Sequence, residues 1–338
     1  MKIAILGAGT WGTALARMLA NAGHEVTMWS ALPEEIRQMQ STHAHRNLPG
    51  MVIPEQIHLT EDIGEAIHGQ EIVVFAVPSV FVRGTVFQAA DYLEQGQILV
   101  DVAKGIEPET LKTMSEIIED VLSANDASVF PVVALSGPTH AEEVAQDMLT
   151  TIVAASKDAE AAKTVQVAFS NDTMRVYTNS DVKGVELCGA LKNVVALAAG
   201  ISRGLGYGDN ARAALITRGM SEITTLGLKM GCLEQTFSGL AGFGDLMVTA
   251  FSEHSRNNRA GYLIGSGKSP AEAVKEVGMV VEGMNALPAA MELSRKYGVE
   301  MPIVEEVDQI VNHGISAKDA VATLMGRALK SEIKTNRA

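Results

Sequence analysis

Short apolar runs alternate with longer amphipathic stretches through the first half of the chain. Apolar runs of this length that are rich in β-branched residues predict buried strands. They cover residues 2–6, 25–29, 71–77, 98–102, 132–135, 151–154 and 174–177. An amphipathic helix is expected at 109–122. Strands that alternate with helices predict an α/β fold with a doubly wound, mostly parallel, Rossmann-like sheet, which binds its ligands at the carboxyl ends of its strands.

The pattern changes near residue 182. Strand-like runs disappear, and stretches rich in Ala, Leu and Met follow helical spacing. The expected helices cover 182–202, 210–230, 255–265, 270–277, 285–297, 302–313 and 316–330, the last with Ser316 as its N-cap and Asp319 at N3. A chain of 338 residues exceeds one ordinary core. We therefore expect two domains, a sheet domain at 1–181 and an all-helical domain at 182–338.

Composition and charge narrow the class of protein. The chain is 47% hydrophobic and 20% charged, which is typical of a soluble globular protein. A net charge of −13 argues against a nucleic-acid partner but permits a small anionic substrate held by a few cationic side chains. The segment 187–201 is short for a membrane span and contains a lysine. With a core strand at the N-terminus and no signal peptide, we expect a cytoplasmic protein rather than a membrane protein.

The cysteines and histidines point to no special chemistry. Cys188 and Cys232 lie in apolar, helix-like segments, so we expect buried thiols rather than a disulfide. The eight histidines are scattered, and neither cysteine has partners at metal-ligand spacing. A bound metal is therefore not expected.

A glycine motif follows the first predicted strand directly and opens a predicted helix. Gly7, Gly9 and Gly12 form G-x-G-x-x-G in the strand–turn–helix context of a dinucleotide site. Gly7 permits the tight turn, Gly9 lets a pyrophosphate approach the backbone, and Gly12 lets the helix pack closely. The N–H groups that open the helix would then face the phosphates. A turn with a purely structural role is the weaker alternative.

The choice between NAD and NADP is not settled by the second predicted strand. Dinucleotide sites usually place an acid about 20 residues after the glycines to bind the ribose 2′-hydroxyl. Neither an acid nor an arginine stands at 28–32, although Ser30 can bond either a hydroxyl or a phosphate. Arg37 and Arg46 can approach a 2′-phosphate, but nothing in the sequence fixes them there.

Lys192 is the strongest candidate for chemistry. It is the only charged residue in 187–201, a helix so apolar that it should be buried on all sides. Burial lowers the pKa of an ammonium group, which suits a lysine that exchanges protons. Asn193 lies beside it, and Gly189 leaves space on the same face. The alternative is a lysine whose stem extends to solvent.

Three further candidates accompany Lys192. Lys104 follows a predicted strand at its carboxyl end, where it should face the cofactor cleft; otherwise it is a surface lysine. Asp245 ends a predicted glycine-rich loop, GLAGFGD, and can also be read as a helix N-cap. The run Ser255–Arg259 (SRNNR) opens a helix with a hydroxyl, amides and arginines, a natural seat for an anion; the alternative is a solvated face capped by the serine.

Taken together, these motifs resemble those of the bacterial NAD(P)-dependent glycerol-3-phosphate dehydrogenase family over essentially the whole chain. In order they are GAGTWGTALA, AVPS, AKG, SGPTHAEEV, ELCGALKNVVALAAG, GDNARAALITRG, GLAGFGDLMVT, SRNNR and VVEG. The resemblance implies the two-domain fold expected above. It also implies reversible reduction of dihydroxyacetone phosphate to sn-glycerol 3-phosphate with NAD(H) or NADP(H), which feeds phospholipid synthesis.

The resemblance assigns a role to each matching position. Lys192 would be the proton donor and acceptor, Asp245 would stand beside the reacting centre, and Lys104 would serve both substrate and cofactor. Further substrate contacts would be Gly137, Thr139, Thr249, Ser255, Arg256 and Asn257. Further cofactor contacts would be Thr10, Trp11, Asn47, Pro78, Ala141, Arg256, Val280 and Glu282. Two departures weigh against strong NADPH selectivity: Ser30-Ala31 replaces a common arginine, and Asn47 replaces a common tyrosine.

Two other functions would also account for some of these sequence features. A two-domain hydroxyacid dehydrogenase also combines a Rossmann sheet, a helical domain and a lysine next to an asparagine, but the run Ser255–Arg259 suits a phosphate better than a lone carboxylate. A non-catalytic dinucleotide sensor explains the glycine motif and leaves Lys192 without a purpose. The many Met and Ala residues of the helical part allow either a core or a homodimer surface.

Overall fold

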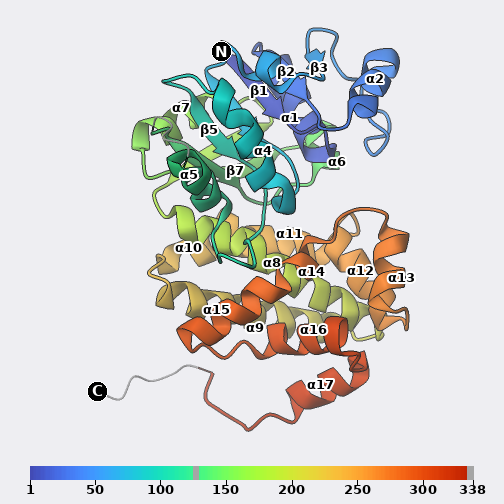
Figure 1. Cartoon of the computed structure of the whole chain (residues 1–338). Helices are drawn as coiled ribbons and strands as arrows, with labels where there is room; N and C mark the ends of the chain where they lie inside the picture. The colour runs from blue at the N-terminus through green and yellow to red at the C-terminus, as the bar shows by residue number, and fades with distance from the viewer. Residues whose placement is uncertain (125–128, 333–338) are drawn as a thin grey trace.

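One sheet organises the N-terminal half of the computed structural model, which describes residues 1–124 and 129–332 (Figure 1). Its strand order is β3-β2-β1-β4-β5-β6-β7-β8, and β7 and β8 run opposite to the other six. The strands are β1 Lys2–Leu6, β2 Glu25–Trp29, β3 His58–Thr60, β4 Ile72–Phe75, β5 Ile98–Asp101, β6 Val132–Ser136, β7 Thr150–Ala155 and β8 Met174–Asn179. The expected mostly parallel sheet is confirmed.

Helices cover both faces of this sheet, and the alternation within β1 shows why. Ile3 and Ile5 pack into one apolar cluster, whereas Ala4 and Leu6 pack into another on the opposite face. The first face is covered by α1 Thr10–Asn21, α2 Pro33–Thr42, α6 Ala141–Val144 and α7 Ala159–Phe169. The second is covered by α3 Ile63–Ile67, α4 Val82–Ala89 and α5 Met114–Ala124. The carboxyl ends of the parallel strands face the C-terminal half.

The C-terminal half consists of helices throughout the described residues. They are α8 Val182–Gly204, α9 Asp209–Lys229, α10 Glu234–Ser238, a π-helical turn at Leu240–Gly244, α11 Asp245–Phe251, α12 Arg256–Gly265, α13 Pro270–Val277, α14 Glu282–Asn285, α15 Leu287–Tyr297, α16 Pro302–His313 and α17 Ala317–Met325. Helix α8 runs along the side that faces the sheet (Figure 1). The expected all-helical second part is confirmed.

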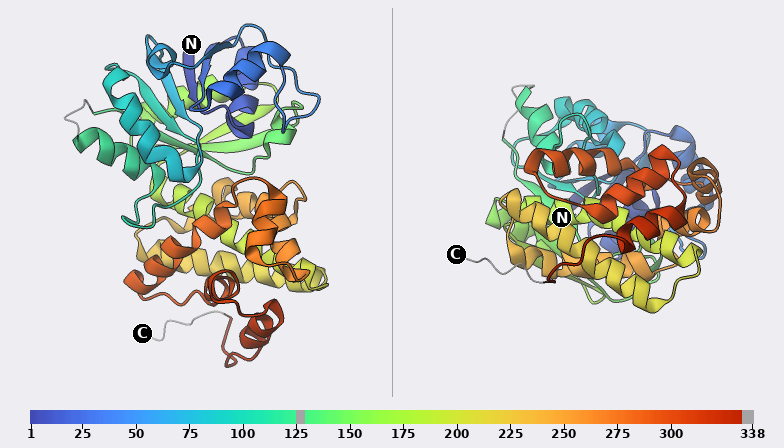
Figure 2. Two further views of the ribbon diagram at one scale, coloured as in Figure 1. Left: turned by 45° about the vertical axis from the view of Figure 1, so that its right-hand side comes forward. Right: turned by 90° about the horizontal axis from the view of Figure 1, so that it is seen from below.

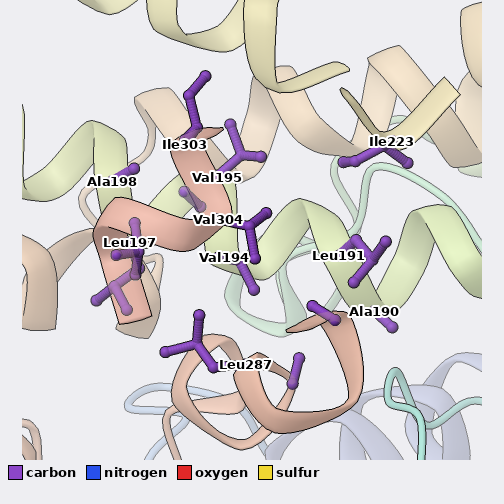
Figure 3. Close-up of a cluster of buried hydrophobic side chains, with 14 of the residues drawn as sticks. Ala190, Leu191, Val194, Val195, Leu197, Ala198, Ile223, Leu287, Ile303 and Val304 are labelled. Carbon is purple, nitrogen blue, oxygen red and sulfur yellow. The ribbon is translucent and has the colours of Figure 1, made fainter. Parts of the chain in front are cut away.

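Helix α8 is the core of this half. Figure 3 shows its apolar side chains among those of Ile223 in α9, Leu287 in α15, and Ile303 and Val304 in α16. Its length and composition would allow a membrane span, so the expectation that the apolar segment is too short, which rested on 187–201, was wrong. The most apolar 18-residue window is nevertheless fully buried. The helix is therefore a buried core helix rather than a span.

Helices α8 and α12 cross at close range because glycines line both surfaces. A Cβ atom at Gly261 would lie 2.1 Å from the carbonyl oxygen of Leu197, and one at Gly200 would lie 2.1 Å from that of Asn258. Neither distance is sterically allowed, so both positions require glycine. This contact holds the first turn of α12 against the helix that carries Lys192.

Some expected boundaries were wrong for local reasons. The helix expected at 109–122 begins only at Met114, because Leu111 has a positive φ of 57° and Ile106 bridges to Thr113 across an irregular loop. The helix expected at 316–330 ends at Met325, although Ser316 caps it as expected. The expected helix at 285–297 is divided between α14 and α15, and β3 was not expected.

The loop that connects β5 to α5, residues 102–113, reaches into the C-terminal half (Figure 2). Ile106 belongs to the apolar core around α8 rather than to the core of the sheet. Just beyond the loop, the backbone N–H and hydroxyl of Ser115 donate to the buried carboxylate of Glu186 on α8, at 2.7 and 2.6 Å. The loop, which carries Lys104, is therefore fixed to the helical half at two points.

Candidate active site

The glycine-rich turn has the shape that a pyrophosphate requires. Gly7 has a φ of 128°, and a Cβ atom there would lie 2.5 Å from the carbonyl oxygen of Ala76. At Gly12 it would lie 2.1 Å from the carbonyl oxygen of Gly7. At Gly9 it would meet no atom within 4 Å. The hydroxyl oxygen of Thr10 is buried and has no hydrogen-bond partner among the described residues. The open space beside Gly9 and the unpaired hydroxyl of Thr10 fit a bound dinucleotide phosphate.

Lys192 is buried, as expected, with 4% of its surface exposed. Its Nζ donates to Oδ1 of Asp245 at 2.6 Å and to the hydroxyl of Thr249 at 2.6 Å. Desolvation lowers the pKa of Lys192 to about 7, and the repulsion from Lys104 acts in the same direction, while Asp245 opposes both. The alternative in which its stem extends to solvent was wrong. An amine with this pKa can be either charged or neutral near neutral pH.

Asp245 links the two lysines. It is fully buried, and its Oδ2 accepts from Nζ of Lys104 at 2.8 Å. Lys104 also donates to the carbonyl oxygen of Gly137 at 3.1 Å, so it is not a surface lysine. Asp245 is the first residue of α11 and directs its carboxylate at the lysines rather than capping the helix. The loop expected before it is a π-helical turn, a feature that often occurs at functional sites.

Two local features bring these groups together. Thr249 lies four residues after Asp245, on the same face of α11. Gly189 leaves the space in which the loop at 102–113 approaches α8, because a Cβ atom there would lie 3.2 Å from Oγ of Ser136 and 3.5 Å from Cγ of Lys104. The space expected at Gly189 is therefore occupied by the neighbouring half of the molecule.

The start of α12 lies beside this cluster. Ser255 caps the helix by accepting from the N–H of Asn258 at 3.2 Å. The amide of Asn257 donates to Oδ1 of Asn193 at 3.0 Å and accepts from the N–H of Gly283 at 2.8 Å. Arg256 is exposed and makes no hydrogen bond or ion pair within the residues that the structure describes. Its guanidinium group is therefore available to an anion.

The remaining expected contacts are spread along the face between the two halves. The carboxylate of Glu282 accepts from the hydroxyl of Ser79 at 2.8 Å and from its N–H at 3.3 Å, which joins α14 to the turn after β4. Ser79 belongs to the AVPS motif, but its contact with Glu282 was not expected from the sequence. Thr139 donates to the carbonyl oxygen of Gly137 at 3.1 Å. Trp11, Asn47, Pro78, Ala141 and Val280 are exposed or half-buried and form no hydrogen bond to Lys192, Lys104 or Asp245 among the described residues.

An acid lies beside the tip of the second strand, although none stands at 28–32 itself. The carboxylate of Glu35, in the first turn of α2, accepts a hydrogen bond from the hydroxyl of Ser30 at 2.9 Å. Arg37 and Arg46 were considered for a 2′-phosphate. In the structure Nε of Arg37 lies 3.6 Å from Oε1 of Glu61, and a terminal guanidinium nitrogen of Arg46 lies 3.8 Å from Oε1 of Glu35. The corner beside the glycine-rich turn therefore contains an acid that the sequence alone did not place there.

Comparison with known proteins identifies the family of this chain. The family models for the N-terminus and the C-terminus of NAD-dependent glycerol-3-phosphate dehydrogenase match residues 2–162 and 181–322. The chain belongs to this family.

No group of three or more His, Cys, Asp or Glu residues in the described parts of the chain is placed to hold a metal ion. Cys188 and Cys232 are buried and free, as expected.

Members of the family match along the full length. A protein of Lactobacillus delbrueckii subsp. bulgaricus named glycerol-3-phosphate dehydrogenase (NAD(P)+) 2 is 63% identical over 333 residues, with 98% of this chain and 99% of that protein covered. A relative from Agathobacter rectalis is 49% identical, with 98% and 97% covered. The crystal structure of glycerol-3-phosphate dehydrogenase from Coxiella burnetii has a TM-score of 0.92 at 34% identity, with 96% and 99% covered.

Proposed function

We propose that this chain is an NAD(P)-dependent glycerol-3-phosphate dehydrogenase. It reversibly reduces dihydroxyacetone phosphate to sn-glycerol 3-phosphate in the cytoplasm and supplies the backbone of phospholipids. Residues 1–181 bind the dinucleotide, and residues 182–338 carry the substrate side of the site. The observation that carries the proposal is the buried amine of Lys192, held by Asp245 within the family's fold.

In this proposal Lys192 moves the proton. The dinucleotide supplies or takes up the hydride when it is bound. During reduction, the ammonium group of Lys192 donates a hydrogen bond to the ketone oxygen, where negative charge develops, and then transfers a proton to it. During oxidation, neutral Lys192 accepts the proton of the substrate hydroxyl. A pKa of about 7 makes both forms accessible at neutral pH.

Asp245 and Lys104 prepare Lys192 for this task. Asp245 fixes the position of Nζ through a 2.6 Å bond and provides the negative charge that keeps a buried ammonium group stable. Lys104 shares the carboxylate and lies against Gly137, so it orients the substrate from the opposite side. Thr249 accepts a second hydrogen bond from Nζ and limits its rotation.

The start of α12 binds the phosphate in this proposal. Arg256 has a free guanidinium group, and Ser255 and Asn257 flank it at the positive end of the helix. Replacing Arg256 by Gln should raise the KM for dihydroxyacetone phosphate about 10- to 100-fold, since a hydrogen bond to a charged group contributes about 1.5–3 kcal/mol. Turnover of phosphate-free dihydroxyacetone should not change.

Arg259→Gln provides the matched control. Arg259 is exposed on the same helix, and its replacement removes the same charge as the replacement of Arg256. An unchanged KM in Arg256→Gln, or an equal rise in both variants, would show that Arg256 does not bind the phosphate.

Reduction of 2-keto acids in place of dihydroxyacetone phosphate would support a hydroxyacid dehydrogenase instead. Dinucleotide binding without turnover of either substrate class would support a sensor. Sedimentation equilibrium of the purified chain will decide between the monomer and the homodimer that the sequence permits.

A further inference from the structure

The tip of strand β2 lies directly beside the glycine-rich turn. Strands β1 and β2 are paired with Leu6 opposite Trp29, and the N–H of Gly7 donates to the carbonyl oxygen of Trp29 at 2.8 Å. Ser30, the next residue, therefore stands at the edge of the turn that faces the dinucleotide. In a Rossmann sheet this is the position that meets the adenosine ribose.

Glu35 returns to this tip from the first turn of α2. Its N–H donates to the carbonyl oxygen of Leu32 at 3.0 Å, which closes the turn before the helix. The hydroxyl of Ser30 accepts from the N–H of Leu32 at 3.1 Å and donates to Oε2 of Glu35 at 2.9 Å. Ser30 is 5% exposed, and the Glu35 side chain is 26% exposed. The carboxylate is thus held in place on one side and open to a ligand on the other.

In the part of the chain that the structure describes, the two arginines considered for a 2′-phosphate both lie beside an acid. Arg46 lies 3.8 Å from Glu35, and Arg37 lies 3.6 Å from Glu61, so each of these arginines already has an acidic partner. His45 is buried beside them, and its Nδ1 accepts from the N–H of Asn47 at 3.2 Å. Burial lowers the pKa of His45, although Glu35 opposes that shift, so the ring adds little positive charge near neutral pH.

We propose that Glu35, positioned by Ser30, makes this enzyme select NADH over NADPH. The carboxylate accepts a hydrogen bond from the ribose 2′-hydroxyl of NADH. The 2′-phosphate of NADPH would place two like-charged groups in contact and would offer no hydrogen-bond donor to the open side of Glu35. This inference rests on the proposed function, because it requires the dinucleotide to bind at the glycine-rich turn.

Direct binding tests the inference without turnover. Dissociation constants for NADH and NADPH are measured by calorimetric titration of the purified protein in the absence of substrate. The natural chain should bind NADH at least about tenfold more tightly than NADPH, the ratio that corresponds to about 1.4 kcal/mol. Glu35→Gln should bind NADPH more tightly and NADH more weakly than the natural chain, so that the ratio approaches one. Glu35→Arg should reverse the preference.

Glu34→Gln is the matched control, since Glu34 is exposed, precedes Glu35 in the same helical turn and carries the same charge. It should leave the ratio unchanged. The inference is overturned if the natural chain binds both dinucleotides equally, if Glu35→Gln keeps the natural ratio, or if Glu34→Gln shifts the ratio as much. Failure of the natural chain to bind either dinucleotide would instead contradict the proposed function.

Discussion

The two ends of the proposed dinucleotide path are built in opposite ways. At the reaction end, Lys192 is 4% exposed, and its environment comes from residues that are far apart in the sequence: Lys104, Asp245 and Thr249. At the ribose end, Glu35 is partly exposed, and its partners Ser30 and Arg46 lie within one short segment. The reaction end depends on how the two halves pack, whereas the ribose end is a local arrangement.

This difference follows from what each end has to do. Proton transfer from an amine near neutral pH requires a lowered pKa, and desolvation by a folded core provides it. That core must also hold a counter-ion, because a buried charge without a partner is strongly destabilising. Discrimination between a hydroxyl and a phosphate requires only one fixed charge at a surface. We therefore expect changes at the reaction end to affect rate, and changes at the ribose end to affect only the choice of cofactor.

Replacing Lys192 by Met should have the largest effect. The variant retains an unbranched apolar stem but loses the proton donor, so kcat should fall by about 10²- to 10⁴-fold. The dissociation constant for NADH should stay the same, because the dinucleotide contacts lie elsewhere. Steady-state kinetics and a binding titration measure the two quantities. Lys183→Met, in the first turn of the same helix where 42% of the lysine side chain is exposed, is the control. A near-normal kcat in Lys192→Met would remove Lys192 from its proposed role.

Replacing Gly9 by Ala should weaken both dinucleotides together, by about tenfold or more, since the added methyl group fills space reserved for the pyrophosphate. The fold should be preserved, because a Cβ atom at Gly9 meets nothing within 4 Å. Gly84→Ala in α4 meets the same condition and should leave binding unchanged. The result separates the turn from Glu35, whose variants should move the two dissociation constants in opposite directions. Normal binding by Gly9→Ala would place the pyrophosphate elsewhere.

The pH dependence should show the smallest change. Reduction requires charged Lys192, so its kcat/KM should fall as the pH rises through about 7; oxidation requires the neutral amine, so its kcat/KM should rise over the same range. In Asp245→Asn the amine loses the charge that raises its pKa, and both midpoints should move down by about one pH unit or more. Rate profiles in both directions measure the midpoints. Midpoints that stay in place or move up would contradict the pairing.

Much of the fold could be predicted because it is encoded locally. The apolar run of β1 and the change to helical spacing near residue 182 both appear in the structure. Strand β3 escaped prediction because its three residues, His58 to Thr60, are too few and too polar to form an apolar run. The start of α5 was misplaced because the amphipathic pattern continues through the loop in which Leu111 adopts a positive φ.

The site could be predicted only where one side chain contrasts with its neighbours. Lys192 is the only charged residue in the apolar segment 187–201, so its burial was expected. Glu35 was missed because the acid was sought at the strand tip, while the structure supplies it from the following helix. The contact between Ser79 and Glu282 was missed because it joins the two halves, and no local pattern encodes such a pair.

The close crossing of α8 and α12 has a consequence for the substrate. With glycine at Gly200 and Gly261, the two helices touch through their backbones and cannot slide past each other. The backbone that carries the proposed proton donor on α8 is therefore held at a constant separation from the backbone at the start of α12, where the proposed phosphate-binding residues lie. In this proposal we expect the enzyme to distinguish keto phosphates by the number of carbons between phosphate and carbonyl.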